Sequence, residues 1–153
     1  MKRKAKKALP KIVTNAESLK SVCQETTLEE GEKIGKLLLS VLDDTPNGAG
    51  LAANQIGIQK RVCAVRVGKR KPFFLINPEI VSSFGRVSFV EGCLSFPGKQ
   101  VITKRYKNIA VRADNLGATK FFTGDDSETL LEVVCIQHEI DHLNGITMFD
   151  RSE

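Results

Sequence analysis

The two histidines of this 153-residue chain stand four residues apart in the segment QHEIDHLNG, residues 137–145. On a helix, His138 and His142 would lie one turn apart on the same face, where two imidazoles can converge on one metal ion. Glu139 directly follows the first histidine and could reach a metal-bound water without binding the metal. The HExxH pattern therefore predicts a metal site, although two histidines on an apolar helix face can also be hydrogen-bonded core residues.

A catalytic metal site of this kind needs a third protein ligand and leaves one position open. The chain has no third histidine and little sequence after His142, so we expect the ligand to come from upstream. Cys93 in EGCLS, residues 91–95, is the candidate, because a tight glycine-containing segment between strands can hold a thiolate in a fixed direction. Cys135 stays open as an alternative, although its position one turn before His138 fits the wall of the site better.

The segment GAGLAANQIG, residues 48–57, consists mostly of small residues that permit close approach to the backbone. Near its end stands Gln55, whose amide is a candidate hydrogen-bond donor to an oxyanion beside the metal. The segment lacks the GK[ST] ending of a phosphate-binding loop. On its own, the pattern is as typical of a purely structural segment, a turn with a tightly packed crossing, as of a functional site.

Two helices should flank the elements that position these residues. Residues 26–44 carry a helical apolar stripe, with Thr27 and Glu30 as a capping box and Pro46 beyond the end. Residues 125–145 predict a second helix that ends at Asn144 and Gly145. Between them, short β-branched and aromatic runs are separated by turn residues: Gly68, Asn77, Pro78, Gly85, Pro97, Gly98 and residues 115–117. This grouping predicts an α+β fold, with antiparallel sheets packed around the helix that carries HExxH.

Composition indicates one soluble globular domain, with 41% hydrophobic and 27% charged residues. No apolar run is long enough to cross a bilayer, and the basic start lacks the apolar stretch of a secretory signal. The four cysteines form no CxxC pair, so we expect reduced thiols in a cytoplasmic protein, or in host cytoplasm if the gene is viral. Five of the first seven residues are basic, and residues 1–8 are expected to form a mobile tail.

Taken together, GAGLAANQ, EGCLS and QHEIDHLNG resemble the three motifs of the peptide deformylases, in the same order and with similar separations. These enzymes remove the formyl group from the N-terminal methionine of new polypeptides. The resemblance extends from about Leu9 to Arg151, within a single expected catalytic domain of residues 9–153, and fits a short form that lacks a long C-terminal helix. It implies metal ligation by Cys93, His138 and His142, with Glu139 as general base and acid.

The resemblance also implies roles in binding the substrate. Gln55 and the backbone N–H of Leu94 would stabilise the oxyanion. Backbone groups would pair with the substrate chain at Ala49, Gly50 and Gly92. A methionine pocket would be lined by Phe89, Leu131, Val134 and Cys135. Ala49 and Gln100 depart from the family pattern, which often has a larger branched residue and an arginine at these places.

Ferrous iron is the ion that the resemblance implies, whereas general ligand rules favour Zn²⁺; Ni²⁺ and Co²⁺ are further alternatives. The expected partners are N-formylmethionyl nascent peptides, with ribosome contact through the basic N-terminus and a monomeric state. Glu91 and Gln137 would support the ligands, and Asp141 would contact an arginine such as Arg105 or Arg112. The rival hypotheses are a metallopeptidase and a binding protein that uses the basic tail and keeps a structural or empty metal site.

Overall fold

The computed structural model describes residues 8–153, so most of the expected basic tail lies outside it. The main elements follow the chain as α1 (Leu28–Asp43), β1 (Gly50–Ala52), β2 (Val62–Val65), β3 (Phe73–Ile76), β4 (Glu79–Gly92), β5 (Gln100–Arg112), β6 (Lys120–Thr123) and α2 (Ser127–Leu143). Three short 3-10 helices complete the set: η1 (Ala16–Leu19), η2 (Ala53–Ile56) and η3 (Met148–Arg151). The predicted α+β class is confirmed.

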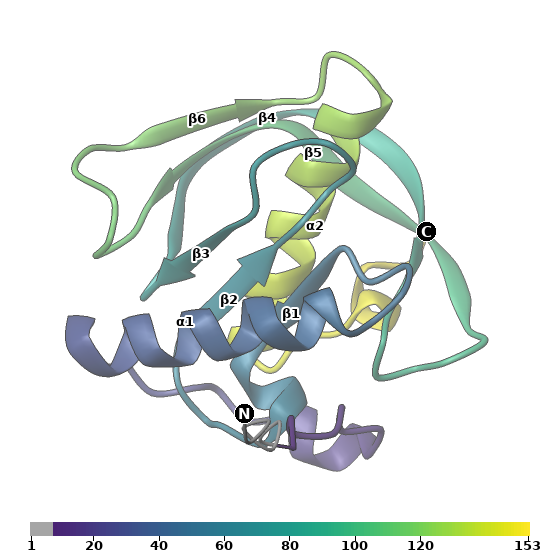
Figure 1. Ribbon diagram of the computed structural model, residues 1–153. Helices are drawn as coiled ribbons and strands as arrows, with labels where there is room; N and C mark the ends of the chain where they lie inside the picture. The colour runs from purple at the N-terminus through teal and green to yellow at the C-terminus, as the bar shows by residue number, and fades with distance from the viewer. Residues whose placement is uncertain (1–7) are drawn as a thin grey trace.

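The strands form two separate antiparallel sheets, ordered β1-β2-β3 and β4-β5-β6. Helix α2 lies between them and contacts β1 and β2 on one side and β5 and β6 on the other, while α1 crosses the outer face of the first sheet (Figure 1). The HExxH helix therefore lies at the centre of the molecule, as the sequence predicts. Within residues 8–153, no helix has the length and apolarity to cross a membrane.

The burial of strand β2 shows that the first sheet is covered on both faces. All four of its residues are buried, which is typical of a strand packed between two layers rather than one with a solvent face. Val62 and Ala64 face the cluster under α1, whereas Cys63 and Val65 face the cluster under α2. The alternation of side chains along the strand thus divides the core into two halves.

Both long helices begin where the sequence predicts. Thr27 caps α1 by accepting a hydrogen bond from the Glu30 N–H at 3.2 Å, although within residues 8–153 no return bond from the Glu30 side chain completes the capping box. Asp126 caps α2 in the same way through Thr129. At the other end of α2, Gly145 adopts a φ of +73°, which an L side chain rarely takes.

Groups from distant segments hold the C-terminal end of α2. The Asn54 amide donates to the carbonyl oxygen of His142 at 2.7 Å. The carbonyl oxygen of Leu143 accepts hydrogen bonds from the Cys23 N–H at 2.8 Å and from Arg61 Nη1 at 3.0 Å. Carbonyls that have no partner within the helix are therefore satisfied by the rest of the fold.

Two details differ from the sequence-based expectation. Gly85 does not separate two strands, because β4 continues through it and the glycine takes a φ of +78° within the paired strand. Residues 48–57 are not only a turn, since Gly50–Ala52 pairs with β2 as strand β1 and is followed by η2. Both departures depend on pairing with distant segments, which local patterns do not reveal.

Candidate active site

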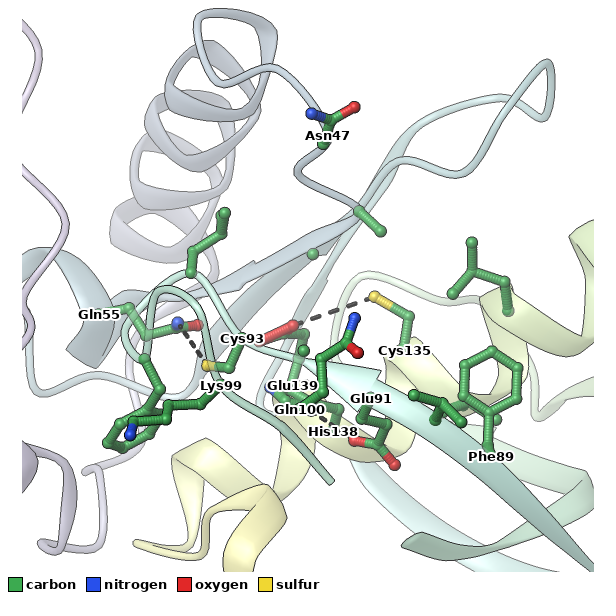
Figure 2. Close-up of a pocket in the computed structure, with 18 of the residues that line it drawn as sticks. Asn47, Gln55, Phe89, Glu91, Cys93, Lys99, Gln100, Cys135, His138 and Glu139 are labelled. Atoms are coloured by element: carbon green, nitrogen blue, oxygen red, sulfur yellow. Dashed lines mark hydrogen bonds and ion pairs between the residues drawn. The ribbon is translucent and has the colours of Figure 1, made fainter. Parts of the chain in front are cut away.

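A cavity of about 530 Å³ lies where β1, the end of β4 and the middle of α2 meet. Its lining includes every residue expected to bind substrate: Ala49, Gly50, Phe89, Gly92, Leu131, Val134 and Cys135. Gln55, Cys93, Leu94, His138 and Glu139 also line it. Figure 2 shows Gln55 and Cys93 toward one end and Phe89 toward the other, with Glu139 and His138 between them. The three motifs, distant in sequence, therefore form one cavity.

One thiol and two imidazoles converge at the wall of this cavity: Cys93 and His138 line it, whereas His142 is fully buried and does not. The Nε2 atoms of His138 and His142 lie 3.2 Å apart, and Cys93 Sγ lies 3.3 Å from His142 Nε2. A tetrahedral ion with bonds of 2.0–2.3 Å would hold its ligand atoms roughly 3.3–3.6 Å apart. The three residues thus fit a metal ion, and they are the only His, Cys, Asp or Glu cluster with such spacing in residues 8–153.

Cys135, the alternative ligand, lies in the wall of the cavity. Its Sγ is 4.0 Å from the Oε2 of Glu139 (Figure 2). Burial raises the pKa of this thiol, and the negative charge of Glu139 raises it further. A neutral thiol is a poor metal ligand, and Cys135 does not belong to the converging group. All four cysteines are free.

His138 is oriented from behind by Glu91, whose Oε1 lies 2.7 Å from the imidazole Nδ1. Glu91 is in turn bound by the Thr103 hydroxyl and by Arg105, whose Nε and Nη2 donate at 2.6 and 2.8 Å. Burial opposes ionisation of Glu91, but the hydrogen bonds from Arg105 and His138 outweigh it and lower its pKa to about 2. The carboxylate is therefore ionised and fixes the imidazole with Nδ1 toward itself and Nε2 toward the cavity.

Asp141 pairs with Arg105, the first of the two arginines that the sequence suggests. Arg105 Nη1 donates to Asp141 Oδ2 at 2.5 Å, and Arg151 also binds this carboxylate. Arg112 instead pairs with Glu79 at the surface. Gln137 does not support a ligand as expected, because its amide holds the backbone N–H and carbonyl of Tyr106 on β5.

The Gln55 side chain is held in one orientation. Its Oε1 accepts a hydrogen bond from the Ala52 N–H at 2.9 Å, so Nε2 must face the cavity. There Nε2 donates to Ser95 Oγ at 3.0 Å and lies 3.6 Å from Cys93 Sγ. Ser95, inside the EGCLS motif, was not singled out from the sequence. Residues 93–96 form a turn closed by a hydrogen bond from the Phe96 N–H to the Cys93 carbonyl at 3.0 Å, so no strand periodicity indicates that Ser95 faces Gln55.

The two neighbouring imidazoles, His138 and His142, carry one positive charge between them. Burial lowers the pKa of His142 to about 3, and the adjacent His138 adds to the effect. Burial opposes protonation of His138 too, but the charge of Glu139 and hydrogen bonds to Cys93 and Glu91 raise its pKa to about 10. Two imidazoles this close hold one charge rather than two, and a bound cation would replace that proton.

Glu139 is placed for proton transfer. Burial raises its pKa to about 7, although the neighbouring His138 opposes the shift. Its Oε1 is buried and has no hydrogen-bond partner within residues 8–153. A carboxyl group with a pKa near neutrality can both accept and return a proton, which suits acid–base catalysis.

Comparison with known proteins agrees with this site. The sequence pattern of the polypeptide deformylase family matches residues 10–153. The peptide deformylase of Heliobacterium modesticaldum is 46% identical over 123 residues, 78% of each chain. That of Natranaerobius thermophilus is 40% identical over 149 residues, 95% of this chain and 94% of the relative.

The fold shows the same relationship. The crystal structure of peptide deformylase from Thermotoga maritima superposes with a TM-score of 0.84 at 30% identity, covering 96% of this chain and 99% of that one. Matches of this extent, in sequence and in fold, cover both sheets, helix α2 and the cavity between them. The chain belongs to the polypeptide deformylase family.

Proposed function

We propose that Cys93, His138 and His142 hold the divalent metal ion with which this family member removes the N-formyl group from the N-terminal methionine of new polypeptides, releasing formate. The observation that carries the proposal is the convergence of one sulfur and two Nε2 atoms beside Glu139, whose Oε1 has no hydrogen-bond partner among residues 8–153. Structural zinc sites use four protein ligands, whereas three converge here and leave room for substrate and water.

When bound, a divalent cation at this place supplies a Lewis acid and lowers the pKa of water toward neutrality. The remaining steps belong to side chains of the protein. Glu139 accepts a proton from the attacking water and later gives it to the departing peptide amine. Its burial, and the closeness of Gly50 on β1, keep the carboxylate in the place where both transfers occur.

Gln55 and Leu94 would stabilise the negative charge that develops on the formyl oxygen. The Gln55 Nε2 is directed into the cavity because the Ala52 N–H holds the other end of the amide. The Leu94 N–H donates no hydrogen bond within residues 8–153, so it is available to a ligand. Loss of one such donor costs about 3 kcal/mol of transition-state stabilisation in comparable sites.

The substrate chain would bind between two strand edges. Among residues 8–153, β1 pairs only with β2 and β4 pairs only with β5, so each leaves one edge without a partner from this part of the chain. Backbone groups of Ala49, Gly50 and Gly92 lie at these edges and can extend the pairing to a peptide. The methionine side chain would then enter the end of the cavity lined by Phe89, Leu131, Val134 and Cys135.

Fe²⁺ is the ion that we propose for the native enzyme, with Zn²⁺, Ni²⁺ and Co²⁺ as substitutes that the same ligands accept. Cys93 is partly exposed in the cavity, so an iron-loaded protein is expected to lose activity in air through oxidation of the ion and of this thiolate. The zinc-loaded protein should lose activity more slowly, since zinc has no redox chemistry. Equal stability of both forms in air would contradict the assignment of iron.

The cellular setting is also a proposal. We place the enzyme in the cytoplasm as a monomer that meets nascent chains at the ribosome, with the basic N-terminal residues contributing electrostatic attraction to RNA. Removal of residues 2–7 should weaken ribosome co-sedimentation, more strongly at low salt. Unchanged co-sedimentation would exclude this role of the N-terminus.

The deciding experiment is an anaerobic assay with formyl-Met-Ala-Ser, coupled to metal analysis of the same preparation. Formate should be released, and unblocked Met-Ala-Ser should remain intact. Glu139→Gln should keep the metal and lose turnover by about 10²–10⁴-fold. Glu132→Gln is the matched control, because Glu132 is buried on the same helix but pairs with Arg70 outside the cavity. Metal retained without formate release would favour a binding protein, and cleavage of internal bonds a peptidase.

A further inference from the structure

The two expected imidazole ligands differ in what holds their second ring nitrogen. Both direct Nε2 toward the converging group, so in each neutral ring the proton must reside on Nδ1 when Nε2 binds a cation. For His138, Nδ1 meets the Glu91 carboxylate. For His142, Nδ1 is buried and finds no partner among the residues that the structure describes. The tautomer of His142 is therefore not fixed by a carboxylate.

A matching acceptor lies on a residue that already contacts His142. Asn54 is fully buried on η2, and its Nδ2 donates to the backbone carbonyl of His142 at 2.7 Å. Its other amide atom, Oδ1, is also buried and lacks a partner within residues 8–153. Buried polar atoms are almost always hydrogen-bonded in folded proteins, either directly or through an ordered water. Here the donor, His142 Nδ1, and the acceptor, Asn54 Oδ1, lack partners within residues 8–153 and belong to two residues that already share a hydrogen bond.

We propose that Asn54 is a positioning residue for the metal ligand His142: its Oδ1 accepts the Nδ1 proton, directly or through one buried water, and thereby presents Nε2 to the ion. The inference rests on the proposed metal site. It gives a role to Asn54, a residue of the GAGLAANQ segment to which the resemblance assigns none. An amide suits this position because it has one donor for the carbonyl and one acceptor for the ring. A single side chain thus fixes both the backbone and the tautomer of the ligand.

The alternative is that Asn54 only holds the end of α2 through the His142 carbonyl. Two substitutions separate these roles. Asn54→Leu removes donor and acceptor while keeping the same branched arrangement of four side-chain heavy atoms, whereas Asn54→Asp keeps an acceptor and loses the donor to the carbonyl. A purely structural residue predicts similar damage from both variants, while a positioning residue predicts that aspartate preserves metal binding.

The test measures zinc affinity by competition with a chelator, and ¹H–¹⁵N spectra of the zinc-loaded protein labelled at histidine. The chain has two histidines, so His138, held by Glu91, is an internal reference in each spectrum. In Asn54→Leu we expect the zinc dissociation constant to rise about 10-fold or more, as for other residues that orient a ligand. The Nδ1–H signal of His142 should shift upfield or exchange with solvent, while that of His138 stays in place.

In Asn54→Asp, the zinc affinity should remain within about threefold of the parent and the His142 Nδ1–H signal should persist. Asn115→Leu is the matched control, because Asn115 also bonds two backbone groups, but on β3, away from the ligands. It should leave zinc affinity and both histidine signals unchanged.

The inference is overturned if Asn54→Leu binds zinc like the parent with an unshifted His142 signal. It is also overturned if Asn54→Asp loses zinc as severely as Asn54→Leu. Should Asn54→Leu fail to fold, the aspartate variant decides by itself. Failure of the parent to bind zinc would instead reject the metal site itself, so the two failures are distinguishable.

Discussion

Arg105 joins Glu91, which supports His138, to Asp141 on the same helix as both histidines. Its guanidinium donates to Glu91 at 2.6 Å and to Asp141 at 2.5 Å, and its side chain is 3% exposed. The three charges link strands β4 and β5 to α2 directly behind the proposed metal ligands. Removing the central cation would leave two buried carboxylates close together, with only Thr103 and His138 as partners of Glu91 and only Arg151 as a partner of Asp141 among residues 8–153.

Arg105→Met should therefore destabilise the protein by about 3–5 kcal/mol, the usual cost of breaking a buried ion pair from one side. Zinc affinity should fall about 10- to 100-fold, because Glu91 would no longer be held against His138. Urea unfolding and chelator competition measure the two effects. Arg112→Met is the control, since its pair with Glu79 is mostly exposed and should contribute less than about 1 kcal/mol.

Glu91 predicts a loss of stability in acid. Its pKa in the folded protein is about 2, below the ordinary value of 4.5. The ionised carboxylate therefore stabilises the fold above pH 4.5, and this contribution is lost as the pH falls toward 2. The difference corresponds to roughly 3 kcal/mol. Unfolding of the metal-free parent and Glu91→Gln should differ most near neutrality and converge in acid, whereas parallel curves would contradict the prediction.

Gln55 and Ser95 should have unequal effects on turnover. Gln55→Leu removes a donor to the developing oxyanion and should lower kcat by about 10²–10³-fold with little change in KM. Ser95→Ala removes only the hydroxyl that accepts from Gln55 Nε2, so its effect should be in the same direction but smaller. Steady-state assays on formyl-Met-Ala-Ser give both values. A larger loss for Ser95→Ala would show that Gln55 is not the principal donor.

Gly50 should tolerate no side chain. A Cβ at this position would collide with Cys135 Sγ and Glu139 Oε2, both in the cavity. Gly50→Ala is therefore expected to displace Glu139, the proposed general base, and to lower kcat/KM by at least about 10²-fold, comparable to misplacing a catalytic group by an ångström. Gly117→Ala is the control because nothing lies within 4 Å of its added Cβ. Unchanged kcat/KM in Gly50→Ala would place Glu139 outside the chemistry.

Much of this site can be predicted from local sequence, and the remainder depends on the pairing of strands that are distant in the chain. His138, Glu139 and His142 lie on one helix, so their spacing alone predicts their relation to one another. The choice of Cys93 over Cys135 came from the resemblance to a family together with the setting of EGCLS, since helical spacing alone left both open. Strand β1 and the continuity of β4 were missed, because both are created by partners far away in the chain.

The sequence of β5 also distinguishes between the two arginines that could pair with Asp141. Ile109 and Val111 on β5 are buried and are separated from Thr103 and Arg105 by an even number of positions. Arg112 is separated from them by an odd number. Because side chains alternate across a strand, this pattern selects Arg105 as the arginine that faces α2. Asn54 has no comparable signal, since its two hydrogen-bonding atoms matter only after η2 meets the end of α2.

Helix ends ordinarily fray, yet the last turn of α2 carries one of the expected ligands. Asn54, Cys23 and Arg61 fasten its final carbonyls to three separate parts of the chain. The end of the helix that carries His142 is thus held by hydrogen bonds within the protein that involve no ion. Departure of one ion should leave the molecule intact, so that a different ion can take its place without refolding.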